Sequence, residues 1–63
     1  MIVLGYRARA NFNKATSAIA KHTNISLAEA KKLTQKIENG EVVTLPDDFV
    51  LREDLEELNF LLS

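Results

Sequence analysis

The chain has 63 residues, of which 46% are hydrophobic and 27% are charged, and its formal net charge is −1. This composition is typical of a folded globular domain and excludes a disordered segment, while the length allows one domain with a thin core. With no cysteine and a single histidine, His22, the chain also lacks the ligands for a disulfide framework or a zinc site.

The first element predicted is a strand over residues 2–10. Ile2, Leu4 and Tyr6 alternate with residues of mixed character, and a period of two is typical of a strand with one buried side. Asparagines at 11 and 13 are suitable caps for a helix that follows. Apolar residues then recur at helical spacing, which predicts a first helix over residues 13–22.

A second helix is predicted over residues 26–38. Thr23-Asn24 ends the first helix, because asparagine tolerates the left-handed conformation found at helix ends. Ser26 and Glu29 have the spacing of a capping box, and Asn39-Gly40 supplies the glycine expected after the last turn. The inward stripe of this helix is predicted to contain Leu27, Ala30, Leu33, Thr34 and Ile37. Two helices joined by so short a turn form a helical hairpin.

The C-terminal part of the chain predicts a strand and a helix. Residues 41–45 are rich in β-branched side chains and stop at Pro46, so they predict a short strand. Leucines at helical spacing predict a third helix over residues 50–62, with no strand after it. The fold class is therefore α+β. Because two strands leave an edge open for pairing, we expect a homodimer or a partner to complete the sheet.

Charge is distributed unevenly along the chain. Residues 1–36 contain seven basic residues and one acidic residue, whereas residues 37–63 contain one basic residue and eight acidic ones. Such a molecule can present a basic surface to an acidic partner although its net charge is close to zero. The plain alternative is that these residues form two ordinary solvated faces.

No residue pattern predicts catalysis. The chain has no cysteine nucleophile and no glycine-rich phosphate loop, and its histidine falls near the C-terminal end of a helix, where the helix dipole explains it. The acidic residues around Asp47 lack the spacing of a calcium loop, so no metal and no cofactor is expected. The apolar run Met1 to Leu4 is too short for a signal peptide or a membrane span, and we expect a cytoplasmic protein.

The most informative segment runs from Thr23 to Leu33. It reads T-N-I-S-L-A-E-A-K-K-L and resembles the pattern T-G-L-G-L-K-E-A-K-x-L in the C-terminal domain of the bacterial ribosomal stalk protein. Asn24 and Ser26 replace two glycines of that pattern. The order of predicted elements is also similar, although the final strand of the family is not predicted in this chain.

The resemblance implies a small β-α-α-β-α plait, in which the helical hairpin packs on a short antiparallel sheet, and it also implies a function. In that family the hairpin surface binds translation GTPases, and the domain is not an enzyme. Ile25, Leu27, Glu29 and Lys31 match the family's pattern around the turn, whereas Ser17 and Ala28 stand where the family has basic residues. Lys21 supplies positive charge nearby.

A helix-turn-helix DNA-binding regulator is the alternative. Ala20, Asn24, Ile25 and Ser26 satisfy that motif, with residues 26–37 as the recognition helix. A single short basic helix offers few phosphate contacts, and an acidic C-terminal helix would be repelled by DNA.

The sequence thus predicts a non-enzymatic module that binds a protein partner with an acidic surface. Nucleic acid is the less favoured partner, and no membrane is expected. The predicted partner-binding residues lie in or next to the hairpin turn: Lys21, Ile25, Leu27, Glu29, Lys31 and Lys32.

Overall fold

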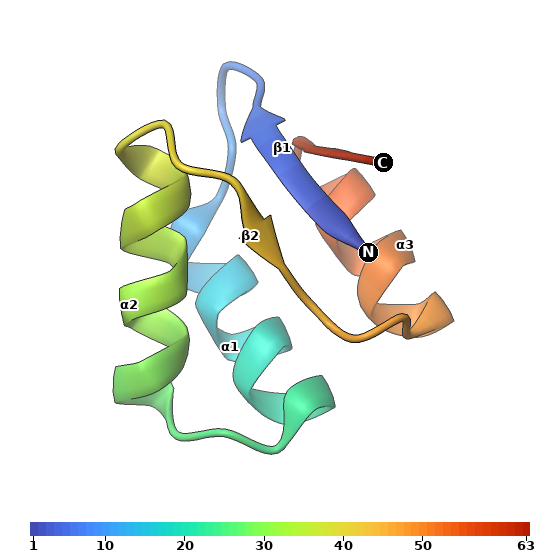
Figure 1. Cartoon of the computed structure of the whole chain (residues 1–63). Helices are drawn as coiled ribbons and strands as arrows, with labels where there is room; N and C mark the ends of the chain where they lie inside the picture. The colour runs from blue at the N-terminus through green and yellow to red at the C-terminus, as the bar shows by residue number, and fades with distance from the viewer.

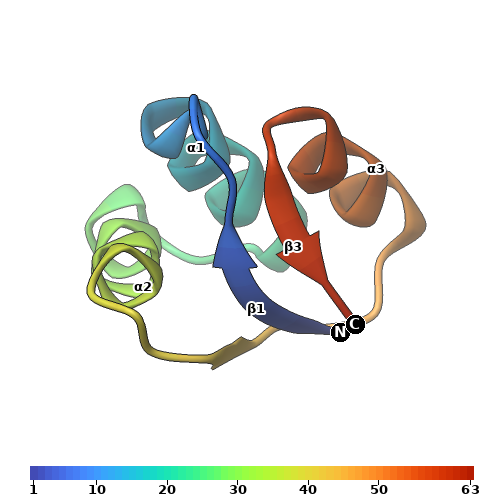
Figure 2. The same cartoon turned by 90° about the horizontal axis from the view of Figure 1, so that it is seen from above.

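In the computed structural model, which describes all residues from Met1 to Ser63, the chain forms three helices and three strands. Figure 1 shows the three helices and the first two strands, and the third strand is seen in Figure 2. Their order along the chain is β1 (Ile2–Tyr6), α1 (Phe12–Thr23), α2 (Leu27–Glu38), β2 (Val43–Thr44), α3 (Phe49–Glu57) and β3 (Phe60–Leu62). The α+β class predicted from the sequence is confirmed. The helices are too short or too polar to cross a lipid bilayer.

The three strands form one antiparallel sheet in the order β2-β1-β3. Val3 in the central strand is opposite Val43 on one side and Leu62 on the other. The β1–β3 pairing contains an irregularity between Val3 and Gly5, consistent with a β-bulge at Leu4. The two ends of the chain therefore lie close together (Figure 2).

The helices cover one face of this sheet. α2 contacts β1 and β2, α3 contacts β3, and α1 lies between α2 and α3 (Figure 2). Hydrophobic side chains from both layers fill the space between them, the largest fully buried ones being Val3, Ile19, Ile37, Leu51 and Leu55. On the other face of the sheet, Leu4 is 54% exposed, and Val42, the residue before β2, is 60% exposed.

The helix predicted over residues 50–62 is wrong at its C-terminal end, and a strand follows it. α3 ends at Glu57, and Asn59 adopts a positive φ of 72°, which turns the chain back. Phe60–Leu62 then pairs with β1. The leucines fit helical spacing, but a short apolar run fits a strand equally well. The final strand that we predicted to be missing is therefore present.

This third strand removes the reason for expecting a homodimer or a partner at an open sheet edge. β1, the longest strand, is central and is paired on both sides. The two edge strands contain only two and three residues, and short edge strands offer little backbone for further pairing.

The first strand is shorter than predicted and buries a different side. It ends at Tyr6 instead of residue 10, because the chain turns at Arg9, whose φ is 70°. The side chain of Val3 is buried. Leu4, which the alternation places on the same side as Ile2 and Tyr6, is exposed. Tyr6 packs edge-on against Phe12, with ring centroids 4.9 Å apart. Burial does alternate along β1, but both sides of the alternation carry apolar residues, so the period of two alone did not identify the buried side.

Candidate functional site

The turn between α1 and α2 reverses the chain within three residues, as predicted. Asn24 has φ 57° and ψ 42°, and its backbone N–H donates to the carbonyl of Ala20. Ser26 caps α2, since its hydroxyl accepts a hydrogen bond of 3.1 Å from the N–H of Glu29. Between them, Ile25 is half-buried and packs against the core. An uninterrupted helix through this segment is therefore excluded.

The two helices are joined along their length by buried contacts. Ala15 and Ile19 of α1 and Ala30 of α2 are completely buried. Midway along the helices, the hydroxyl oxygens of Thr16 and Thr34 lie 2.8 Å apart, within hydrogen-bonding distance. Small side chains allow the helices to approach closely, and this contact fixes which residues of each helix face solvent.

Four of the six predicted partner-binding residues are charged and exposed. Lys21, Glu29, Lys31 and Lys32 all face solvent, whereas Ile25 is half-buried. The placing of Leu27 in the inward stripe of the second helix is wrong, because 62% of this residue is exposed. It is the first residue of α2, where the turn carries it past the end of the interhelical contact.

Three of these residues share one surface. Leu27 and Lys31 are four residues apart, so they lie one above the other on the helix, and Lys32 lies beside Lys31. We call this surface the α2 outer face, and it consists of the exposed residues Leu27, Ala28, Lys31, Lys32 and Gln35. These five residues include no acidic one, and the exposed Glu38, seven residues after Lys31, lies on the same side at the far end of the helix.

Lys21 lies elsewhere. It follows Lys14 by seven residues and Ala18 by three, so it shares their side of α1. Lys14 and Ala18 line a pocket between α1 and α3, whereas Thr16, on another side, contacts α2. The hairpin therefore does not bring Lys21 together with Lys31 and Lys32.

The hairpin charges have no partners within the chain. No lysine or arginine side chain makes an ion pair, and the carboxylate of Glu29 accepts no hydrogen bond, so only one half of the capping box is formed. The one ion pair that involves no histidine joins the amino-terminal ammonium of Met1 to Asp47, and the imidazole of His22 lies beside carboxylates of Asp48 and Asp54. Unpaired exposed charges remain available to an external partner.

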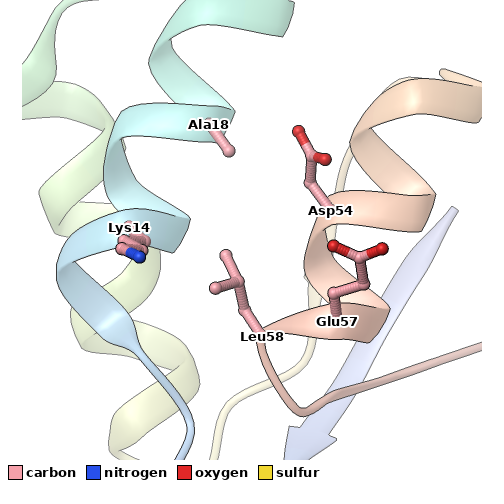
Figure 3. A pocket seen from close by; sticks show the side chains of 5 residues that line it. All are labelled: Lys14, Ala18, Asp54, Glu57 and Leu58. Atoms are coloured by element: carbon pink, nitrogen blue, oxygen red, sulfur yellow. The ribbon is translucent and has the colours of Figure 1, made fainter.

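A second polar cluster, which was not predicted from the sequence, lies between α1 and α3. Nε2 of His22 is 3.5 Å from a carboxylate oxygen of Asp54, and Nδ1 is 4.0 Å from one of Asp48. Nearby is an open pocket of about 280 Å³ (Figure 3), lined by Lys14, Ala18, Asp54, Glu57 and Leu58. The carboxylates of Asp48 and Asp54 therefore act on His22 in addition to the helix dipole. Only the packing of α3 on α1 brings these residues together, so no local pattern could have revealed the cluster.

This cluster lacks the parts of a nucleophilic site. No serine or threonine hydroxyl is hydrogen-bonded to His22, although the imidazole lies beside carboxylates. Nor does the structure gather three or more histidine or acidic side chains in an arrangement that could hold a metal ion. The contacts of His22 attach α1 to α3.

One acidic residue has a perturbed pKa. A carboxylate oxygen of Asp47 accepts a hydrogen bond of 2.7 Å from the amino-terminal ammonium of Met1. This hydrogen bond and the positive charge of the ammonium lower the pKa of Asp47 below its ordinary value of 3.8. The interaction secures the β2–α3 loop to the start of β1.

Comparisons with known proteins returned no match, either to a family model, to a curated protein or to a solved structure.

Proposed function

We propose that this chain is a non-enzymatic binding module that docks a protein partner with an acidic surface through its helical hairpin. The observation that carries the proposal is the α2 outer face. There, a leucine that is 62% exposed is followed one turn later by two lysines without intrachain partners. An apolar anchor beside unpaired cations fits an acidic surface that contains an apolar depression.

The resemblance to the C-terminal domain of the ribosomal stalk protein supports the same surface. In that family the hairpin binds translation GTPases, and Leu27 and Lys31 match its pattern. The strand Phe60–Leu62 removes one departure from the family's element order, since a final strand belongs to it. Asn24 adopts the left-handed conformation that a glycine would supply at that position.

The six residues have different roles in this proposal. Leu27, Lys31 and Lys32 contact the partner, whereas Ile25 anchors the turn to the core and Ser26 with the backbone of Glu29 starts the helix. Lys21, on the other side of α1, attracts an acidic partner over distance without touching the apolar anchor.

Affinity capture tests the proposal. The wild-type chain, the double variant Lys31→Gln/Lys32→Gln and the variant Leu27→Ala are immobilised and exposed to a lysate of the native host, and retained proteins are identified by mass spectrometry. Binding of the recovered partner is then titrated. We expect both variants to bind it about tenfold more weakly or worse, with unchanged melting temperatures because these side chains are exposed.

Lys14→Gln is the matched control, since it removes one positive charge on the pocket side of α1. Equal affinity of the wild type and the α2 variants would refute the proposal. Retention of duplex DNA, with binding that falls steeply as salt increases, would instead favour the helix-turn-helix alternative.

A further inference from the structure

The exposed side of α3 carries a surface opposite in charge to the hairpin. We call it the α3 outer face, and it consists of Phe49, Val50, Glu53, Glu56 and Glu57, all of them exposed. Phe49 is 75% exposed and Val50 52%, so two apolar side chains lie next to each other at the start of the helix. The basic residue of α3, Arg52, points away and donates to the carbonyl of Ser63 at 2.8 Å.

The α2 and α3 outer faces have matching patterns. Each begins with a large exposed apolar residue at the first position of its helix, Leu27 in α2 and Phe49 in α3. In each helix a charge follows four residues later, on the same side: Lys31 in one and Glu53 in the other. When the two helices lie side by side and run in the same direction, contact between the apolar residues also brings the opposite charges together.

These two faces cannot meet within one molecule. α1 lies between α2 and α3, and the two outer helices make no contact with each other (Figure 2). The glutamates of α3 form no ion pair in the chain, and neither do the lysines of α2. The complementary surfaces therefore point outward on opposite sides of the same fold.

We propose that the α3 outer face binds the α2 outer face of a second copy of this chain. The contact is head-to-tail, because each copy uses one surface to bind and offers the other to the next copy. Charge complementarity and the two apolar anchors select this occupant. Each face occupies less than three turns of helix, so the association is weak and is strongest at low salt.

This inference rests on the proposed function in that it uses the same hairpin surface. A neighbouring copy then competes with the acidic protein partner for Leu27 and Lys31. Self-association reduces the fraction of hairpins that are free to bind.

Sedimentation equilibrium over a range of chain concentrations, at low and at high salt, measures the association. We expect the average mass of the wild type to rise with concentration at low salt and to return to the monomer value at high salt. Phe49→Ser/Glu53→Gln removes one face, and Lys31→Gln/Lys32→Gln removes the other. Each variant alone should remain monomeric, with an unchanged melting temperature.

Mixing the two variants is the decisive experiment. Each retains the surface that the other lacks, so an equimolar mixture should form a one-to-one dimer and nothing larger. A matched apolar control, Leu4→Thr/Val42→Thr, changes the uncovered face of the sheet and should associate as the wild type does. The proposal is overturned if the wild type is monomeric throughout, if the mixture stays monomeric, or if the sheet variant alone abolishes association.

The same variants separate this inference from the proposed function. Phe49→Ser/Glu53→Gln leaves the hairpin intact, so it should still bind the captured partner. Partner binding without self-association would refute the head-to-tail contact alone. Self-association without any captured partner would refute the docking function alone.

Discussion

At the scale of the residue, Asn24 determines the direction in which the chain leaves α1. Its left-handed conformation directs Ile25 toward the core and lets Ser26 begin the next helix at once. Asparagine is among the few residues other than glycine that adopt this conformation readily. The α2 outer face therefore depends on a residue that takes no part in it.

We predict that Asn24→Ala lowers the free energy of unfolding by about 1 kcal/mol, since alanine is disfavoured at a positive φ of 57°. Asn24→Gly should be neutral or slightly stabilising at the same position. Urea denaturation of the three proteins measures the difference. Equal stability of the alanine variant and the wild type would show that the turn does not require this conformation.

Asp47 makes stability depend on pH in one direction. Because its pKa is lowered in the folded chain, its contribution is present above the ordinary carboxyl pKa of 3.8 and is lost as pH falls through the folded value. We predict that Asp47→Asn melts at a lower temperature than the wild type at pH 7 and that the difference shrinks in acid. The effect is small because the carboxylate is 87% exposed. A difference in melting temperature that is the same at pH 7 and pH 3 would contradict this assignment.

At the scale of the element, β3 depends on contacts that are distant in sequence. The ring of Phe60 is buried and packs edge-on against Phe12, with centroids 5.2 Å apart. Asn59 supplies the turn that redirects the chain out of α3. An asparagine is a weak local sign that a helix ends, whereas the leucine spacing predicted a helix that continues past this residue.

We predict that Phe60→Ala costs about 3 to 5 kcal/mol of unfolding free energy, because it removes a buried ring and leaves a cavity. Leu61→Ala, at a partly buried position of the same strand, should cost clearly less. Denaturant titration of both variants tests whether β3 is part of the cooperative fold. Equal small losses would indicate that the strand is detached from the core.

At the scale of the whole molecule, basic and acidic residues lie on different surfaces, whereas all the helices and strands contribute to one core. The basic α2 outer face and the acidic α3 outer face lie on opposite sides of α1, and neither has partners within the chain. One core joins all the elements, with buried residues from the sheet and from every helix. One small domain therefore has two exposed surfaces of opposite charge.

A core this small gives the chain a low free energy of unfolding, so a single large cavity can destabilise it severely. At about 0.05 to 0.15 kcal/mol per residue, a chain of 63 residues has a total stability of roughly 3 to 9 kcal/mol. We predict that Leu51→Ala, at a completely buried position, removes about 3 to 5 kcal/mol and populates the unfolded state at 37 °C. Circular dichroism at that temperature checks this, and Leu27→Ala, at an exposed position, is the control. A fully folded Leu51 variant would show that the core tolerates the cavity.

The sequence alone determined the local parts of this fold. The caps, the left-handed turn and the helical spacing predicted α1 and α2 to within one residue at each end, and the exposed charges of Lys31 and Lys32 followed from that spacing. These features depend on neighbours along the chain. Hydrogen bonds and steric preferences within a few residues fix them.

The tertiary structure decided the rest. It turned Phe60–Leu62 into a strand, moved Leu27 out of the core and placed Lys21 away from Lys31. It also joined His22 to Asp54 and kept α2 and α3 on opposite sides of α1. The exposure of Leu27 follows from its place at the start of α2. The other outcomes depend on contacts between residues far apart in sequence, which no local pattern records.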